Sequence, residues 1–404
     1  MRPIYLDNNA TTRTDPAVVA AMLPFFSEQF GNASSSHAFG SEVAGAVKQA
    51  RKSLQALLGA AFDHEIVFTS GGTEADNAAL LSALDNKDKD GRDEIVTSAV
   101  EHPAVLAPLD HLEKARGIKV HRIGVDAQGR LDIEAYRHAL GPRTAIASVM
   151  SANNETGTLF PVEQLAEMAH GAGALFHTDA VQAVGKIPLD LKITQIDMLS
   201  LSGHKLHGPK GIGALYLRKG TPFNPLIRGG PQERRRRGGT ENVPAIVGLG
   251  KAAEMALALM QDEQTRVRTL RDRLERGILE IGHCMVLGDA ENRLPNTSNI
   301  AFEHLEGEAI LHHLNKTGIA ASLGSACASG SMEPSHVLRA MNVPLTALRG
   351  AIRFSLSRDN TIDDVVCVLN LLPDIIARLR ALSPPRQEHE PVVAHPSRSP
   401  ELTP

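Results

Sequence analysis

One lysine lies directly after a predicted strand, a position where α/β proteins commonly bind ligands and carry catalytic groups. Lys205 follows an apolar run that predicts a strand over residues 198–202, and it lies in the Gly- and Pro-rich segment Gly203–Gly211. A lysine is most often a solvated surface charge. Loops at the carboxyl ends of parallel strands, however, bind ligands in open α/β sheets, and a lysine desolvated there can form a Schiff base. Lys205 is therefore our candidate for covalent catalysis.

Two further segments supply groups that such a lysine can use. In Thr69–Ala75 a strand ends, two glycines allow a close turn and a helix begins, so backbone N–H groups can bind an anion. Taken alone this is a simple turn with a threonine cap, and it matches neither the dinucleotide nor the Walker pattern. Asp179 follows a predicted strand, where an aspartate alone is usually a helix cap. Pyridoxal phosphate needs a carboxylate at its ring nitrogen. The turn at Thr69–Ala75, Asp179 and Lys205 follow one another along the chain, and together they predict an enzyme that uses this cofactor.

The three cysteines, Cys284, Cys327 and Cys367, are far apart and form no paired motif, which is typical of a reducing compartment. Cys327 is surrounded by small and polar residues in the segment Ser322–Ser331. That composition favours an exposed thiol on a mobile loop over a buried position. The other two cysteines stand in apolar surroundings and are expected to be structural.

The elements that must position these groups follow one rhythm in the first half of the chain, where short β-branched runs alternate with helical patterns. The expected strands are 65–69, 94–97, 119–123, 145–150, 174–178, 198–202 and 213–217. This alternation predicts a mainly parallel sheet buried on both faces by helices. One such helix is expected where Val43, Val47, Ala50 and Leu54 recur at helical spacing.

The alternation of predicted strands and helices ends at about Pro244. A long helical pattern from Ala245 to about Gly282 leads to further short elements, which predict a smaller α+β domain. The expected elements are strands at 285–287, 298–302 and 352–356 and helices at 307–317 and 335–341. We divide the chain into an N-terminal arm that packs with the small domain, a large cofactor domain, a small domain that carries Cys327, and a disordered Pro-rich tail. Their expected ranges are 1–15, 16–260, 261–382 and 383–404.

Composition narrows the function classes. The chain has 404 residues, a formal charge of −4, 3% aromatic residues and no tryptophan, so a nucleic-acid partner is not expected. The run Arg234–Arg237 is short and lacks aromatic neighbours, and we interpret it as a solvated loop near the phosphate site or the dimer interface. Seventeen histidines show no ligand spacing, and no membrane span or secretory signal is visible. The expectation is a cytoplasmic protein without a metal site of its own.

Longer stretches of the chain resemble one family, and the resemblance runs from the N-terminus to beyond residue 370, with only the Pro-rich tail outside it. The matching stretches are Tyr5–Thr12, Gly31–Ser35, Glu101–Val105, Ala152–Gly157, His177–Gln182, Ser202–Gly211, Gly239–Asn242, Gly324–Cys327 and Arg353–Leu356. The sequence resembles a cysteine desulfurase of the aminotransferase class V, fold-type I pyridoxal phosphate superfamily, and is most similar to the nitrogen-fixation (NifS-type) branch. The resemblance implies that α/β fold, with a large domain and a smaller α+β C-terminal domain.

The resemblance also implies a role for each site residue. Lys205 would hold pyridoxal 5′-phosphate covalently, Asp179 would pair with its ring nitrogen, and His102 would stack on its ring. Asn154 and Gln182 would donate hydrogen bonds on the side of the phenolic oxygen. The phosphate would be bound by Gly72, Thr73, Ser202, His204 and Thr240. In the family the residue at the position of Thr240 belongs to the neighbouring subunit, which implies a homodimer with shared active sites.

For the substrate, the resemblance implies L-cysteine, with its carboxylate held by Arg353 and Asn154. Lys205, released from the cofactor, would remove the Cα proton, and His102 could relay protons. The Cys327 thiolate would take the sulfur as a persulfide and leave L-alanine. The sulfur would pass to a NifU-type iron–sulfur scaffold that serves nitrogenase maturation. Cys327 would then contact metal only transiently, through a cluster shared with that scaffold.

Other functions on the same fold stay open at this point. A housekeeping cysteine desulfurase and a selenocysteine lyase need the same groups. An aminotransferase has no need of a thiol such as Cys327 on a flexible loop. A catalytically inactive scaffold would be expected to have lost Lys205 or Asp179, and both are present.

Overall fold

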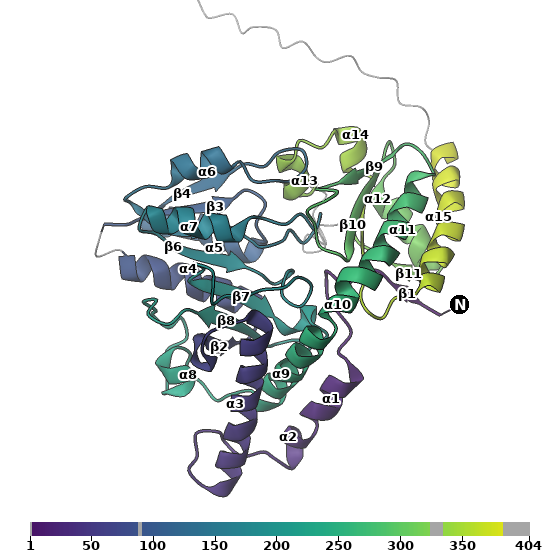
Figure 1. Cartoon of the computed structure of the whole chain (residues 1–404). Helices are drawn as coiled ribbons and strands as arrows, with labels where there is room; N and C mark the ends of the chain where they lie inside the picture. Colours follow the sequence, from purple (N-terminus) through teal and green to yellow (C-terminus); the bar gives the residue numbers. More distant parts are fainter. Residues whose placement is uncertain (1, 88–90, 324–333, 383–404) are drawn as a thin grey trace, which may run out of the picture.

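The computed structural model describes residues 2–87, 91–323 and 334–382, which form two lobes (Figure 1). The predicted tail at 383–404 and Cys327 lie outside the described residues. The larger lobe contains the central sheet, and the smaller lobe contains the outer helices of the C-terminal part of the chain.

A seven-stranded sheet forms the centre of the large lobe, in the order β2-β8-β7-β6-β5-β3-β4. Its strands are β2 (Ile66–Thr69), β3 (Glu94–Ser98), β4 (Lys119–Ile123), β5 (Thr144–Ser148), β6 (Leu175–Asp179), β7 (Met198–Ser202) and β8 (Gly213–Leu217). The prediction of a mainly parallel sheet is confirmed, since only β8 runs antiparallel to its two neighbours. Strands β5, β6, β7 and β8 are buried along their whole length, as a sheet with two covered faces requires.

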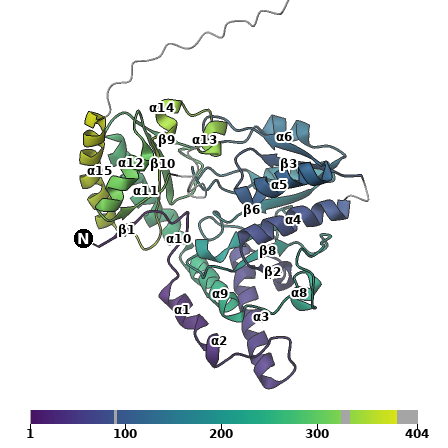
Figure 2. The ribbon, with the colours of Figure 1, turned by 180° about the vertical axis from the view of Figure 1, so that it is seen from behind.

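Helices cover both faces of this sheet (Figures 1 and 2). They are α3 (Ala38–Leu58), α4 (Gly72–Lys87), α5 (Pro103–Arg116), α6 (Ile133–Ala139), α7 (Val162–Gly171) and α9 (Val243–Ala258). Because side chains alternate along a strand, Leu199 and Leu201 of β7 join the core beneath α3, α7 and α9, whereas Met198 joins the core beneath α4 and α5. The predicted apolar stripe of α3 is buried, and the helix ends at Gly59 in the left-handed conformation.

The small lobe is built on a three-stranded antiparallel sheet in the order β12-β10-β9. Its elements are β9 (Cys284–Leu287), β10 (Thr297–Phe302), β12 (Ala351–Ser355), α11 (Arg268–Leu279), α12 (Gly307–Lys316), α13 (His336–Ala340), α14 (Leu345–Leu348) and α15 (Ile362–Leu382). Apolar side chains of α11, α12 and α15 pack with Phe302 and Phe354 of the sheet in a separate core.

The N-terminal segment begins in the small lobe and then crosses to the large one. β1 (Ile4–Tyr5) pairs in parallel with β11 (Ile319–Ala320), and Ile4 and Leu6 are buried in the small-lobe core. The chain then passes the region between the lobes and enters α1 (Pro16–Met22) and α2 (Pro24–Ser27) against the large lobe. The remaining short elements are η1 (Asp63–Glu65), η3 (Gly203–Lys205) and α8 (Gln232–Arg235).

The expected helical pattern from Ala245 to about Gly282 is present, but it is bent rather than one straight helix. After α9 the chain continues through α10 (Met260–Asp262) and a π-helical turn, η4 (Glu263–Val267), into α11 at 55° to α9. The bend has a packing reason, because α9 is buried in the large-lobe core whereas Val267 and α11 are buried in the small-lobe core. Among the described residues no single helix is long and apolar enough to cross a membrane, and this bent pair meets that test only when its halves are combined.

Candidate active site

A cavity of about 460 Å³ lies between the lobes at the carboxyl ends of β6 and β7. Most of the predicted site residues line it, although they come from segments far apart in the sequence. These are Gly72, Thr73, His102, Asn154, Asp179, Gln182, Ser202, His204, Lys205 and Arg353. The structure therefore brings the proposed cofactor groups and the proposed substrate-binding arginine to one place.

Lys205 is positioned by the N-terminal segment. It ends the short helical turn η3 directly after β7, and its Nζ donates to the carbonyl oxygens of Asn9 and, at 2.7 Å, of Ala10. The loop that carries it is held by Thr12, whose backbone N–H and Oγ1 donate to His204 O at 2.9 and 2.8 Å. The stretch Tyr5–Thr12 carries part of the family resemblance, but its sequence did not predict that its backbone carbonyl groups contact Lys205.

Asp179 ends β6 and is buried, with its Oδ1 accepting from Val181 N at 2.9 Å. Burial raises the pKa of Asp179 to about 6, while the Val181 hydrogen bond and the charge of Lys205 oppose that rise. A buried carboxylate of this kind gains free energy from a cationic N–H group placed against it, because the opposite charge offsets the desolvation. Asp179 therefore fits a protonated ring nitrogen.

The cavity also contains an anion cradle at the start of α4. Gly72 begins that helix, and a Cβ at this position would lie 2.8 Å from Val181 Cγ2 and 3.7 Å from Ser202 Cβ. The absence of a side chain thus lets the helix N-terminus, with its exposed N–H groups and positive dipole end, approach the loop after β7. Thr73, Ser202 and His204 line the same region. This arrangement fits a phosphate group.

His102 is a neutral histidine at the cavity wall. It caps α5, and its Nδ1 accepts from Ala104 N at 3.1 Å, so Nε2 is the ring nitrogen that carries the proton. Burial lowers the pKa of His102 to about 4, and the positive charges of Lys205 and His336 act in the same direction. An uncharged imidazole can lie against an aromatic ring and exchange a proton through Nε2.

Arg353 brings the small lobe into the site. It lies on β12 with 1% of its surface exposed, and it donates from Nη2 to Asp7 Oδ1 and from Nη1 to Asn154 O, both at 2.8 Å. The guanidinium therefore joins the small lobe, the N-terminal segment and the large lobe at the edge of the cavity. A buried arginine in this position attracts a carboxylate and can bind it with two hydrogen bonds. Asp7 was not among the predicted residues.

Two buried carboxyl groups behind Asp179 were also missed. Glu101 accepts from Ser98 Oγ at 2.5 Å and Met150 N at 2.9 Å, and burial raises the pKa of Glu101 to about 8. Burial and the charge of Asp179 raise the pKa of Asp76 well above its usual value. Burial thus favours the protonated form of Glu101, and the charge of Asp179 acts in the same direction. No sequence signal distinguished these carboxyls, because their state depends on burial.

Two further hydrogen bonds, one to Glu155 and one from His336, join the lobes at the cavity wall. Ser335 caps α13 and donates from Oγ to Glu155 Oε2 at 2.5 Å, and His336 Nε2 donates to Glu101 O at 2.9 Å. Burial raises the pKa of Glu155. Glu155 and His336 both line the cavity. Their partners are distant in the sequence, so these contacts could not be read from spacing.

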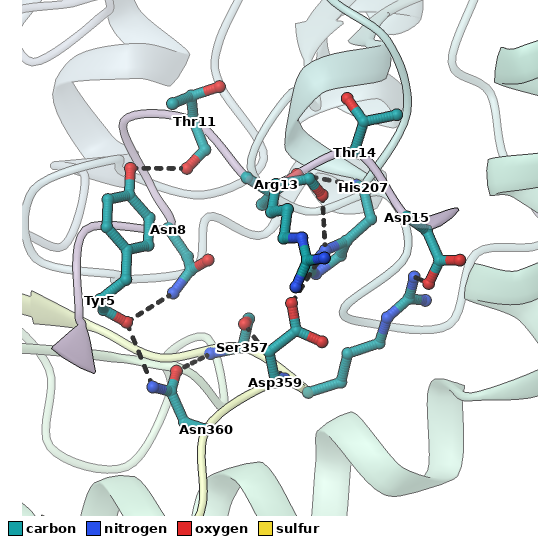
Figure 3. A network of polar contacts seen from close by, with 12 residues as sticks. Tyr5, Asn8, Thr11, Arg13, Thr14, Asp15, His207, Ser357, Asp359 and Asn360 are labelled. Atoms are coloured by element: carbon teal, nitrogen blue, oxygen red, sulfur yellow. Dashed lines mark hydrogen bonds and ion pairs between the residues drawn. The ribbon is translucent and has the colours of Figure 1, made fainter. Parts of the chain in front are cut away.

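The N-terminal segment also ties the Lys205 loop to the small lobe from outside (Figure 3). His207 Nδ1 donates to Arg13 O at 3.1 Å, and Asp15 Oδ2 accepts from Arg358 Nη2 at 2.7 Å. Asn360 donates to Tyr5 O at 3.1 Å. His207 has a left-handed backbone with φ of 58°, which lets the chain turn sharply behind Lys205. The loop is held from both lobes, so Lys205 is positioned rather than solvated.

The remaining predictions of the sequence concern residues outside this cavity. Thr240 is exposed and does not line the cavity of the single chain, so its place in a neighbouring subunit's site stays a prediction. Cys284 and Cys367 are half-buried in the small lobe, as expected. Among residues 2–87, 91–323 and 334–382, no three His, Cys, Asp or Glu side chains are placed to hold a metal ion.

The arginine run is only partly solvated, since Arg234 and Arg235 are exposed whereas Arg236 and Arg237 have partners. The contact of Arg237 with α4 agrees with the expected location near the proposed phosphate site. Arg236 donates to His64 O at 2.6 Å, and Arg237 pairs with Glu74 in the first turn of α4 at 3.0 Å. The neighbouring Glu233 is buried and pairs with Arg51. These contacts hold the turn around α8, so at least two of the arginines have structural partners.

Comparison with known proteins places this site in a family. The aminotransferase class-V family model matches residues 4–368. A cysteine desulfurase of Gluconacetobacter diazotrophicus is 71% identical over 95% of this chain and 96% of its own length, and the cysteine desulfurase NifS of Azotobacter vinelandii is 60% identical over 95% of each. A solved NifS-like protein superimposes with a TM-score of 0.87 at 37% identity, covering 93% of this chain and 100% of its own. The chain belongs to the aminotransferase class-V family, in its cysteine desulfurase branch.

Proposed function

We propose that the protein removes sulfur from L-cysteine, releases L-alanine and holds the sulfur as a persulfide on Cys327. One observation carries this proposal: Lys205, Asp179 and Arg353 converge on one cavity in a chain 71% identical to a cysteine desulfurase. The first two residues suit a pyridoxal phosphate enzyme, and the third suits an amino acid substrate.

The residues present fit pyridoxal phosphate, the cofactor of this family. Lys205 would hold it covalently, Asp179 would face its ring nitrogen, and His102 would lie against its ring. Its phosphate would lie at the start of α4, where the close approach of Gly72 to Ser202 leaves the cradle described above. When bound, the cofactor withdraws electrons from the substrate's Cα and so makes the Cα proton removable.

The chain's own residues bind the substrate and move the proton. Arg353 would hold the substrate carboxylate, with Asn154 beside it, and so orient the Cα bond. Lys205 Nζ would accept the Cα proton, since the carbonyls of Asn9 and Ala10 keep that amine at the cavity wall. His102 is neutral at physiological pH and would relay a proton through Nε2.

Sulfur transfer would use Cys327 as the nucleophile. Its thiolate attacks the substrate sulfur, an S–S bond forms while the substrate's Cβ–S bond breaks, and the electron pair of the broken bond stays on the carbon skeleton. Two protons then complete L-alanine, and the enzyme retains Cys–S–SH. We expect contact with metal only when this persulfide meets a cluster on an acceptor.

A homodimer with shared active sites is part of the proposal. Leu23, Phe26, Phe30 and Phe39 of the segment around α1, α2 and the start of α3 are each more than half exposed, and the rings of Phe30 and Phe39 lie 5.8 Å apart. A cluster of exposed apolar side chains of this kind favours a protein–protein interface. A second copy covering this surface would also agree with the exposure of Thr240.

The acceptor would be a NifU-type iron–sulfur scaffold in the cytoplasm, and the sulfur would serve nitrogenase maturation. The similarity to an enzyme named NifS supports this role over housekeeping cluster assembly. Sulfur transfer to purified scaffolds of the two kinds, compared at equal concentration, would test the preference.

The central experiment follows alanine and sulfide release from L-cysteine in the presence of a thiol reductant. Lys205→Ala and Cys327→Ala should each abolish release, whereas Cys284→Ser and Cys367→Ser should retain it. Hydride reduction of the wild-type protein should leave a pyridoxyl group on Lys205. Turnover by Cys327→Ala would remove that residue from its role, and faster turnover of selenocysteine than of cysteine would reassign the substrate.

A further inference from the structure

A buried lysine, Lys186, lies behind the cavity and has no role in the mechanism above. Lys186 is 6% exposed and stands four residues after Gln182. Its Nζ donates to Gln182 O at 3.0 Å and to Gln182 Oε1 at 3.4 Å. Burying a lysine costs free energy because its charge is desolvated, so a buried lysine usually makes polar contacts that an apolar side chain cannot make. Its two hydrogen-bond partners both belong to a residue that lines the cavity.

These contacts determine which way the Gln182 amide faces. An ammonium group has only donors, so it requires the amide oxygen on its own side. The amide nitrogen is then turned the other way, where Nε2 donates to Asn9 O at 2.9 Å. Lys205 donates to the same carbonyl oxygen. A continuous line of hydrogen bonds thus runs from Lys186 through Gln182 and Asn9 to the Lys205 amine.

A buried carboxyl group at the junction between the lobes lies near Lys186, and burial raises the pKa of that group, Glu263. Glu263 begins the π-helical turn η4, is 8% exposed and lines the same small cavity as Lys186. Burial lowers the pKa of Lys186 to about 8, and the negative charge of Glu263 opposes that fall. Lys186 therefore remains an ammonium group at neutral pH.

We propose that Lys186 is a positioning residue of the active site, which holds the Gln182 amide with its oxygen turned inward and its N–H groups turned to Asn9 and the cavity. An acceptor atom of the bound cofactor would then meet a donor at Gln182 rather than a carbonyl oxygen. Without Lys186 the amide could rotate and present either group. The inference rests on the proposed cofactor site, and it assigns to Lys186 an effect that acts through Gln182.

A double-mutant cycle tests this assignment. Lys186→Met, Gln182→Ala and the double variant are compared by the cofactor released on dilution of the holoenzyme and by the pH titration of its absorption band. Each single variant should weaken cofactor retention by about tenfold, the usual scale for a charge-assisted hydrogen bond. The double variant should be no weaker than either single one, because both changes remove the same oriented donor. Effects that multiply to about a hundredfold, or a Lys186→Met protein with wild-type retention, would overturn the proposal.

Two controls separate positioning from folding. Lys192→Met makes the same chemical change at an exposed lysine nearby and should leave retention unchanged. Lys186→Met combined with Glu263→Gln removes both buried charges, and it should restore folding stability without restoring retention. If the variant with both substitutions did restore cofactor retention, the role of Lys186 would be to neutralise Glu263, and the assignment to Gln182 would be wrong. A wild-type protein without a pyridoxyl adduct on Lys205 would instead refute the proposed function itself.

Discussion

Replacing Asp179 with asparagine should stabilise the protein when no cofactor is bound, and the gain should depend on pH. Burial raises the pKa of Asp179 from 3.8 to about 6. One pKa unit corresponds to about 1.36 kcal/mol, so ionisation of this buried group costs the folded state about 3 kcal/mol once the pH is above both values. Asparagine keeps the shape and can still accept from Val181 N, but it carries no charge.

The sign of the pH dependence follows from the direction of the shift. An acid with a raised pKa binds its proton more tightly in the folded protein, so folding is favoured at low pH and this advantage is lost as the pH rises from about 4 to about 6. Relief by Asp179→Asn should therefore be about 3 kcal/mol at pH 7 and about half that at pH 5. Other buried acids also titrate, so the quantity to compare is the difference between the variant and the wild type at each pH.

Chemical denaturation of the cofactor-free proteins at pH 5 and pH 8, at one protein concentration, measures this difference. Asp289→Asn is a control of opposite sign, because the ion pair with Arg130 lowers the pKa of Asp289 to about 2. That variant should lose stability at pH 8, and the loss should fade below about pH 4. An Asp179→Asn protein that is no more stable than wild type at pH 8, or equally stabilised at both pH values, would refute the reasoning.

Three further outcomes are expected. Arg353→Lys should lower kcat/KM for L-cysteine by about ten- to a hundredfold, because lysine cannot bind a carboxylate with two parallel hydrogen bonds. An unchanged kcat/KM in steady-state assays would count against Arg353 as the group that binds the substrate carboxylate. Arg293→Met should destabilise the protein by about 3 kcal/mol or more in urea unfolding, because it leaves Glu275, which Arg293 contacts twice at 2.6 Å, buried without its cation. Gly72→Ala should weaken cofactor retention by about tenfold, because its Cβ would lie 2.8 Å from a neighbouring side chain. Gly71→Ala is the matched control, with no atom within 4 Å of its Cβ, and equal effects of the two variants would contradict a cradle at Gly72.

Local patterns determined much of this protein. Each of the seven strands of the large sheet lies within two residues of its predicted range, because β-branched runs bounded by turn residues are a local signal. Lys205 and Asp179 could be chosen for the same reason: both directly follow such runs, and the carboxyl ends of parallel strands meet at one edge of a sheet. The residue types at those ends then limited the chemistry.

The tertiary structure alone decided what surrounds those groups. Asn9 lies against Lys205, and His336 against Glu101, across separations of about two hundred residues or more, and no spacing rule connects such pairs. The bend at Glu263 likewise arises because one helical stretch must enter two different cores. The protonation states of the buried acids also could not be predicted from the sequence. Glu101 and Asp179 are both ordinary acids in the unfolded chain, and burial and neighbouring charges in the fold raise their pKa values to different extents. Residue type and order are local properties of a chain, whereas desolvation and distance exist only after it has folded.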